Sequence, residues 1–323
     1  MDEKRKKRLL WQVPFLVLLV VGTVLIIRQQ RAEPYQHCKG FVFGTIYNVT
    51  YQSPNDLQAE IEKELKKVDM EFSMFNDSST VARINRGENP PRSAMFEEVY
   101  QLAQTVSRET DGSFDITVAP LVNAWGFGFK SQQMPTPAQV DSLRKIKDQM
   151  DFSAIAKGYG SEVVARLLRR HDIRNFMVEI GGEVVVQGIS DKRLPWKIGV
   201  TKPTDDTLSY NSEIQAVLNV TDISMATSGN YRNFYYKGGK KYAHTINPKT
   251  GYPVQHSLLS ATVLAQDCSV ADAYATSFMV MGVDRAKEVL AKHPELKAYF
   301  IYSADDGQLA VWYSPSLKDK IAE

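Results

Sequence analysis

The sequence of 323 residues has few cysteines, few histidines and little excess charge. Its two cysteines, Cys38 and Cys268, are too few for a disulfide scaffold and lack the clustered spacing of a zinc site. The formal net charge is only +2, and residues 4–8 alone supply five lysines and arginines. A broad basic surface is therefore absent, which argues against nucleic-acid binding. Because the sequence also has no internal repeat or low-complexity segment, it indicates an ordinary globular body.

One long apolar run stands near the start of the chain. Residues 9–27 are mostly apolar, and a helix of this length spans about 28 Å, close to the hydrocarbon thickness of a bilayer. The run ends in Leu, Ile, Ile and Arg instead of the small residues of a signal-peptide cleavage site, and Cys38 lacks the small residues that precede a lipoprotein cysteine. We therefore expect an uncleaved transmembrane anchor, with the body across the membrane from a basic N-terminus. The predicted divisions are a cytoplasmic segment at 1–8, the anchor at 9–27, a linker at 28–40 and one folded domain at 41–323.

Apolar periodicity in the body predicts groups of strands and groups of helices. Residues 41–51 predict a strand, with a bulge or close approach at Gly44. Helices are predicted from Ser53, from Ser93 until just before Gly112, and from Thr136. Later strands are predicted at 175–180, 183–187, 196–200, 214–220, 233–236, 242–246, 259–265, 298–302 and 308–313, with helices from Ser269 and Asp284. Because strands mostly follow strands, the predicted fold class is α+β.

Two glycine-containing segments have the composition of binding loops. Residues 111–128 combine glycines, which let a backbone approach a ligand closely, with Phe and Trp faces that suit a flat ring system. The alternative is a helix C-cap at Gly112 followed by ordinary core aromatics. In residues 151–160, Lys157 and glycines lie near a helix start, where free N–H groups and the helix dipole favour a phosphate. Alternatively, Lys157 is a solvated surface lysine.

Three further segments carry groups that are suited to binding or catalysis. Arg232, in a turn after a strand, can bind a phosphate or carboxylate with two hydrogen bonds, or lie on the surface. His244, at a strand end, stands where a general base would face a cleft, although a lone histidine is often structural. Asp272 and Thr276, at i and i+4 on one helical face, offer hard oxygens for Mg²⁺. The alternatives are a capping box between Asp272 and Ser269, and a bond from Thr276 to a backbone carbonyl.

Taken together, these segments resemble the ApbE family of FAD:protein FMN transferases, in order as well as in content. The family's block from Thr-Asp-Gly to Trp-Gly-Phe-Gly stands here at residues 110–128. The other matching blocks are a strand near Gly44, a serine-containing segment at 72–79, and residues 155–159, 180–183, 226–229 with 231–232, 244–248 and 271–276. The resemblance does not cover residues 1–40. It implies an α+β fold with mixed or antiparallel sheets and packed helices.

The resemblance also implies roles for individual residues. Mg²⁺ would be held by Asp272, Thr276 and the carbonyl oxygen of Ala154, and His244 would be the catalytic base. Contacts with FAD are implied for Phe43, Phe75, Ser113, Phe114, Asp115, Asp151, Lys157 and Ile246. Many members have methionine in place of Phe43 and tyrosine in place of Phe75, so this end of the pocket is expected to differ in detail. Compared with the tyrosine of many members, Phe75 keeps an aromatic face for stacking but lacks the hydroxyl.

The reaction that the resemblance implies is Mg²⁺-dependent transfer of FMN from FAD to a threonine hydroxyl of an acceptor protein. A phosphoester bond would form and AMP would be released. The implied acceptors are respiratory electron-transfer subunits with a threonine flavinylation motif, and the implied location is the bacterial inner membrane, with the catalytic domain in the periplasm. Two alternatives remain: a metal-dependent FAD pyrophosphatase that uses water in place of threonine, and an anchored flavin-binding protein without catalysis. His244, Asp272 and Thr276 argue against the latter, because flavin storage needs neither a base nor a metal.

Overall fold

A computed structural model of the chain describes residues 12–23, 33–128, 134–203, 213–230, 234–237 and 240–322. The body is organised around one large sheet. The strands of this sheet are β1 (Tyr35–Val42), β2 (Thr45–Gln52), β3 (Phe176–Ile180), β4 (Glu183–Gln187), β7 (Ile223–Gly229), β10 (Leu258–Ala265), β11 (Lys297–Ser303) and β12 (Leu309–Tyr313).

Two small sheets and a set of helices complete the body. The strands of the small sheets are β5 (Trp196–Thr201), β6 (Ile214–Val220) and β13 (Ile321–Ala322), and β8 (Phe234–Lys237) and β9 (Lys240–Ala243). The helices are α2 (Gln58–Phe72), α3 (Thr80–Asn85), α4 (Ala94–Glu109), α5 (Ala119–Ala124), α6 (Pro137–Leu143), α7 (Ala156–Arg170), α8 (Cys268–Met281) and α9 (Val283–Lys292), with 3-10 turns η1 (Ile116–Val118) and η2 (Pro315–Lys320).

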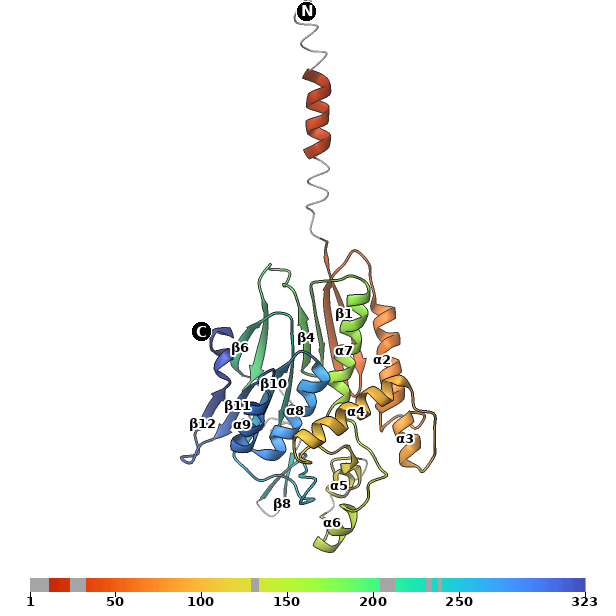
Figure 1. Cartoon of the computed structure of the whole chain (residues 1–323), viewed down its shortest axis with the longest axis vertical. Helices are drawn as coiled ribbons and strands as arrows, with labels where there is room; N and C mark the ends of the chain where they lie inside the picture. The colour runs from red at the N-terminus through yellow and green to blue at the C-terminus, as the bar shows by residue number, and fades with distance from the viewer. Residues whose placement is uncertain are drawn as a thin grey trace, which may run out of the picture.

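The large sheet has the strand order β1-β2-β3-β4-β7-β10-β11-β12, and the three-stranded sheet has the order β13-β6-β5. All pairings among the described strands are antiparallel. Helices α2, α4, α7 and α8 lie on one face of the large sheet (Figure 1). The predicted α+β class is confirmed, and of the two sheet types that were expected, only the antiparallel one occurs in the described part of the chain.

Alternation of side chains along the central strands explains why the large sheet is covered on both faces. In β4, Val185 packs among the helices, whereas Val184 and Val186 pack against β5 and β6 on the other face. In β10, Val263 packs toward the helices and Leu264 toward the small sheet. Successive strand residues point to opposite faces, so a strand buried on both sides is continuously apolar. The large sheet is therefore the middle layer of three.

The N-terminal ends of α7 and α8 meet in the helix layer at an unusually close contact. A Cβ atom on Gly158 would lie 2.4 Å from the carbonyl oxygen of Cys268 and 2.8 Å from the Cβ of Asp272. Only glycine therefore allows the two helices to approach this closely. The small side chains of Ala271 and Ala275, both buried, also suit α8 to close packing. This contact brings the first turn of α7 beside the first two turns of α8.

The strand predicted at 41–51 is confirmed over residues 45–51, which lie in β2, but it is not one continuous strand, because the chain turns back at residues 43 and 44. Phe43 and Gly44 have φ angles of 51° and 75° and form a two-residue turn between β1 and β2. Two consecutive positive φ angles are typical of a tight hairpin, but the usual Asn-Gly or Asp-Gly signal is missing here. β1 also begins at Tyr35, inside the segment 28–40 that was expected to be a linker.

The two cysteines do not form a disulfide. Cys38, in β1, and Cys268, at the start of α8, are both buried free thiols.

Two helix starts were predicted correctly, and each has a capping side chain directly before the helix. Ser93 Oγ accepts the N–H of Phe96 at 3.1 Å, and α6 begins after Thr136 as predicted, where Thr136 also forms a capping box with Gln139. Helix α2 begins later than predicted, at Gln58, because the Ser53 hydroxyl accepts the N–H of Asn55 in a local turn.

Two segments that were expected to be irregular contain regular structure. Residues 111–128 include η1 and α5, and residues 225–229, expected to lead into a turn, belong to β7. Helix α8 begins at Cys268 with Asp267 as its N-cap, one residue before the predicted start at Ser269. Tyr231 and Arg232 lie outside the described residues.

The predicted membrane anchor is only partly described. Residues 12–23 form a helix, and the remainder of the expected span at 9–27 lies outside the described residues. Among the residues that the structure describes, no helix has both the length and the apolar character needed to cross a bilayer.

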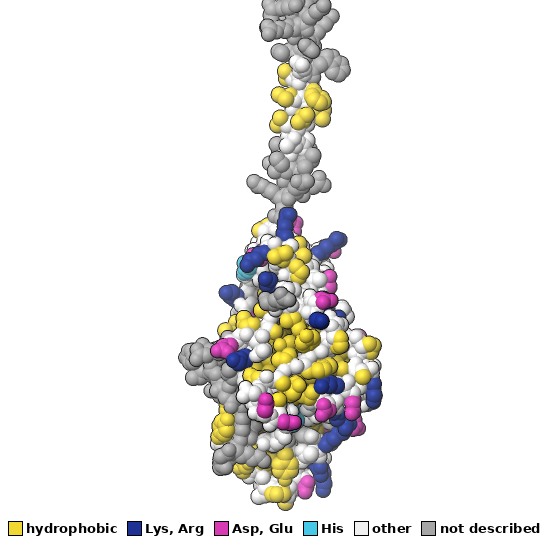
Figure 2. All heavy atoms as spheres, turned by 90° about the vertical axis from the view of Figure 1, so that its left-hand side faces the viewer, with side chains coloured by type: hydrophobic (Ala, Val, Ile, Leu, Met, Phe, Trp, Pro, Cys, Tyr) yellow, Lys and Arg dark blue, Asp and Glu magenta, His cyan; other side chains and the backbone are white. Residues whose placement is uncertain are grey.

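One face of the body carries a concentration of hydrophobic side chains. Figure 2 shows them near the middle of the face on which β6 and β12 lie, with charged side chains around them. Ile214 at the start of β6 and Leu309 at the start of β12 are exposed, while Val311 and Tyr313 are half-buried against the core between the two sheets. The apolar layer between the sheets therefore extends toward the surface on this side.

Candidate active site

Two adjoining cavities, of about 570 and 650 Å³, lie where the helix layer meets the ends of β2, β4 and β7. The five residues common to both linings are Met74, Phe75, Asp151, Ser153 and Lys157. The twelve residues that were predicted for the site all line one or both cavities. They are Phe43, Phe75, Ser113, Phe114, Asp115, Asp151, Ala154, Lys157, His244, Ile246, Asp272 and Thr276.

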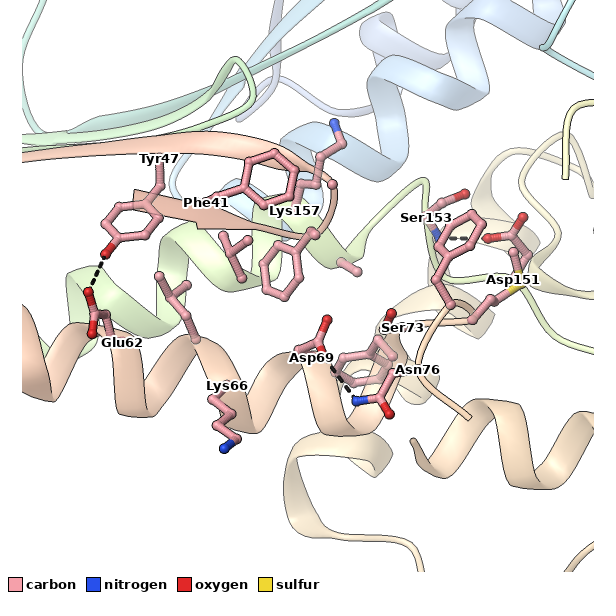
Figure 3. Close-up of a pocket in the computed structure, with 18 residues that line it drawn as sticks. Phe41, Tyr47, Glu62, Lys66, Asp69, Ser73, Asn76, Asp151, Ser153 and Lys157 are labelled. Atoms are coloured by element: carbon pink, nitrogen blue, oxygen red, sulfur yellow. Dashed lines mark hydrogen bonds between the residues drawn. The ribbon is translucent and has the colours of Figure 1, made fainter. Parts of the chain in front are cut away.

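The first cavity is mainly apolar and is bounded by the β1–β2 hairpin, by α2 and by the segment after α2 (Figure 3). Phe43, in the hairpin turn, packs so closely on α7 that a Cβ on Gly160 would lie 2.6 Å from its ring. Phe75 is 75% exposed at the boundary with the second cavity. Two aromatic faces at the edge of an apolar cavity are suited to a flat ring system.

Hydrogen bonds fix two acidic side chains on the wall of the second cavity. Asp115 Oδ1 accepts from the backbone N–H of Thr117 at 2.8 Å, and its Oδ2 accepts from Lys147 Nζ at 2.8 Å. Asp151 Oδ1 accepts from the N–H of Ser153 at 2.8 Å. Burial raises the pKa of Asp151, and the bond from Ser153 opposes this effect. Both carboxyls therefore have defined orientations before any ligand binds.

Lys157, in the first turn of α7, is not the solvated surface lysine that was the alternative interpretation. Its Nζ lies 2.6 Å from Glu183 Oε1, in an ion pair between α7 and β4. Burial lowers the pKa of Lys157, but attraction to the Glu183 and Asp272 carboxylates outweighs it, so the pKa lies above its ordinary value. The helix start therefore presents a fixed positive charge that suits anion binding, whereas the N–H groups of Ala156 and Gly158 are already bonded to the Phe152 carbonyl oxygen and to Asp272 Oδ2.

The sequence did not predict Glu183 as a site residue. It follows the Gly181-Gly182 turn at the start of β4 and lines the second cavity. Burial raises its pKa to about 7, with Lys157 opposing the rise and Asp272 adding to it. The sequence feature that could have identified Glu183 is its position as an acidic residue directly before three valines in a predicted strand, Glu-Val-Val-Val.

The capping-box interpretation of Asp272 is wrong. Asp267 is the N-cap of α8, and Asp272 Oδ2 instead accepts the backbone N–H of Gly158 at 3.0 Å, across the contact between α7 and α8. Thr276 Oγ1 lies 3.0 Å from the hydroxyl oxygen of Ser228, so this hydroxyl bonds to a neighbouring strand. Burial raises the pKa of Asp272 against the opposing effects of Lys157 and of the Gly158 N–H.

The residues around Asp272 have the chemistry of a site for a hard divalent cation. Ala154, Asp272 and Thr276 line the same cavity and can offer a carbonyl, a carboxylate and a hydroxyl oxygen. In the described part of the chain, no group of three or more His, Cys, Asp or Glu side chains is arranged to hold a metal. A cation here would thus depend on one carboxylate, neutral oxygens and a ligand's own oxygens, which is the pattern that Mg²⁺ uses with phosphates.

Aromatic packing connects His244 with the segment 111–128. His244 follows β9 and lines the second cavity, with its ring edge-on to Phe127 at a centroid distance of 6.4 Å. Phe127 stacks on Tyr235, and Tyr235 on Tyr242, at 5.2 and 5.4 Å. The β8–β9 hairpin that precedes His244 is therefore held by aromatic side chains from the 111–128 segment.

The aromatic residues of 111–128 divide between the two interpretations that the sequence left open. Phe114 and Phe127 line the second cavity, as expected for ligand binding. Trp125 is only 2% exposed, stacks on Tyr242 and donates from its indole Nε1 to the carbonyl oxygen of Gly251 at 2.8 Å. Trp125 is thus a core aromatic that fixes the loop after His244.

Comparison with known proteins agrees with this geometry. The family model described as "ApbE family" matches residues 43–300. A relative from Vibrio cholerae named FAD:protein FMN transferase is 35% identical over 320 residues, which covers 90% of this chain and 94% of the relative. One from Haemophilus influenzae with the same name is 36% identical and covers 90% and 93%. The solved structure of the flavin transferase ApbE from Vibrio cholerae has a TM-score of 0.78 at 33% identity, over 89% of this chain and all of that one. The chain belongs to the ApbE family.

Proposed function

We propose that this chain is an FAD:protein FMN transferase that moves FMN from FAD to a threonine hydroxyl of acceptor proteins, with Mg²⁺, and releases AMP. The relatives' shared name supports the choice of FAD as donor and of a protein as acceptor. The observation that carries the proposal is the second cavity, where the Lys157 side chain, an oxygen-rich helical face and a histidine line one space. Phosphoryl transfer depends on this combination of positioning and charge stabilisation.

Each part of the site has a distinct task in the proposed reaction. Phe43 and Phe75 would flank a ring of FAD, and the ammonium of Lys157 in the first turn of α7 would attract its pyrophosphate. Ala154, Asp272 and Thr276 would hold Mg²⁺, which when bound neutralises charge on the pyrophosphate and on the leaving AMP. His244 would take the proton of the threonine hydroxyl as its oxygen attacks the FMN-side phosphorus. The bond from that phosphorus to AMP then breaks, and AMP leaves with the electron pair.

Mass spectrometry of an acceptor protein tests the proposal. The full-length chain in detergent is incubated with FAD, Mg²⁺ and an acceptor that carries an accessible threonine in an Asp- and Gly-containing motif. We expect the acceptor to gain the mass of FMN less one water, and a threonine-to-alanine acceptor to gain nothing. AMP release at equal rates with and without the acceptor, and no mass gain, would instead identify an FAD pyrophosphatase.

Replacement of His244 by alanine separates a catalytic base from a binding residue. A base acts mainly in the transition state, so we expect transfer to fall by about 10²–10⁴-fold while the Kd for FAD changes only a few-fold. Single-turnover transfer and fluorescence titration of FAD measure the two quantities. Loss of FAD affinity with unchanged turnover of bound FAD would show that the base lies elsewhere.

Asp272→Asn distinguishes the metal role from the structural bond to Gly158. The amide keeps an oxygen that can accept the Gly158 N–H, so the fold should survive, but it loses the charge that a divalent cation needs. We expect the rise in Tm caused by Mg²⁺ to disappear and Mg²⁺-dependent transfer to be nearly abolished. Thermal unfolding with and without Mg²⁺ provides the first measurement. A variant with the wild-type rate and the wild-type Mg²⁺ requirement would contradict the assignment of this face.

We also propose that residues 9–27 anchor the chain in the bacterial inner membrane, with the body in the periplasm. The basic residues at 4–8 precede the apolar run, and a matching basic run does not follow it. Alkaline phosphatase fused after Glu323 should therefore be active, and a cytoplasmic reporter at the same position inactive. The reverse pair of results would overturn this topology.

A further inference from the structure

The ion pair between Lys157 and Glu183 leaves one carboxylate oxygen without a hydrogen-bond partner. Glu183 is 1% exposed, and its Oε1 lies 2.6 Å from Lys157 Nζ. Its second oxygen, Oε2, is buried and has no hydrogen-bond partner. A buried carboxylate oxygen without a donor is unfavourable, because it has lost its hydration without compensation. The pair is therefore poorly explained as a device for stability alone.

The backbone holds Glu183 firmly beside the start of α7. Gly181 and Gly182, with φ angles of 61° and 106°, form the turn that brings Glu183 to the head of β4. The hydroxyl of Ser161, one turn after Lys157, donates to the backbone carbonyl oxygen of Glu183 at 3.0 Å. A carboxylate held in this way restricts the ammonium of a lysine whose long side chain is otherwise flexible.

The position of the pair on the cavity wall indicates what this restriction serves. Both residues line the second cavity, together with Asp272 and Ala154. We propose that Glu183 is a positioning residue for the transfer reaction, which holds the Lys157 ammonium where the pyrophosphate of FAD binds. This inference rests on the proposed function, because it assigns the anion at the start of α7 to FAD. Glu183 itself does not contact the pyrophosphate, since its negative charge would repel it.

The chain contains a closely matched control for Glu183. Glu162, also on the helix side of the sheet, is 4% exposed and pairs with Arg169 at 2.7 Å. Its Oε2 is likewise buried without a hydrogen-bond partner, but it lines neither cavity. Neutralising either glutamate should destabilise the fold in the same way, and only Glu183→Gln should change the binding of FAD.

The experiment compares Glu183→Gln and Glu162→Gln in the full-length protein. We expect Glu183→Gln to raise the Kd and the KM for FAD by about ten- to a hundredfold, as for other residues that orient a ligand-binding group. The kcat at saturating FAD should change by less than about fivefold, because Lys157 is displaced but still present. Glu162→Gln should leave both FAD constants within about twofold of wild type, whatever it does to Tm.

A double-mutant cycle tests whether Glu183 acts through Lys157. In a Lys157→Met background, Glu183→Gln should change the Kd for FAD by less than about twofold, because the group that it positions is gone. The double variant also removes both charges together, so it leaves no unpaired buried charge and keeps the test usable if a single variant unfolds.

Three outcomes would overturn the inference. The first is an unchanged FAD affinity in folded Glu183→Gln. The second is a tighter FAD affinity in this variant, which would show only that repulsion between Glu183 and the pyrophosphate had been relieved. The third is an equal effect of Glu183→Gln on the Kd for FAD with and without Lys157. Failure of the proposed function is distinguishable, because FAD binding is measured without an acceptor. A wild-type protein that binds FAD but modifies no acceptor would refute the transferase proposal. The double-mutant cycle of Glu183 and Lys157 would still test the inference, because it measures only the Kd for FAD.

Discussion

The contact between the N-terminal ends of α7 and α8 is the constraint on which the candidate site depends. Gly158 has no side chain to separate the helices, and its N–H donates to Asp272 Oδ2. This one bond brings the helix start that carries Lys157 beside an oxygen-rich helical face. Lys157, the preceding residue, then lies against β4, where Glu183 pairs with it. A displacement of α7 relative to α8 would separate all of these groups.

The electrostatic balance of this region explains why it suits a cation and a phosphate together. One half-buried ammonium lies beside two buried carboxyls, and burial raises the pKa of both carboxyls. A divalent cation favours the ionised carboxylates, and a pyrophosphate then balances the added positive charge. The first cavity, with Phe43 and Phe75 at its edge, supplies an apolar space next to this charged centre. The two cavities together can therefore receive a ligand with a flat ring at one end and phosphates beyond it.

Local patterns in the sequence predicted the parts of the fold that depend on local physics. Ser93 and Thr136 start helices because their hydroxyls cap the following N–H groups, and the Gly181-Gly182 turn was recognisable between two apolar strands. The turn at Phe43-Gly44 was not predicted, because a phenylalanine at positive φ has no sequence signature. The strand at 223–229 was obscured by its Ala-Thr-Ser-Gly end, which is typical of a turn.

The candidate site could be predicted as a set of residues, chiefly through the family resemblance, but not as an arrangement. The sequence around Asp272 is compatible with a capping box inside its own helix, whereas its hydrogen-bond partner is Gly158 in another helix. Glu183 has no local feature that indicates a pair with Lys157, because that pair depends on the packing of α7 against β4. Trp125 and Phe127 are two residues apart, yet one fixes a loop and the other lines the cavity. Contacts between distant segments decide these roles.

The most direct test of this account is the shift in Tm that Mg²⁺ causes in the presence of FAD, measured on Gly158→Ala and on the wild-type protein. In a helix without tertiary contacts, replacing glycine by alanine would stabilise the helix by about 1 kcal/mol. Here the new Cβ would lie 2.4 Å from the Cys268 carbonyl oxygen, so the helices must move apart. The account predicts a lower Tm and loss of the Mg²⁺-induced shift in Gly158→Ala. A higher Tm with the wild-type Mg²⁺ response would contradict it.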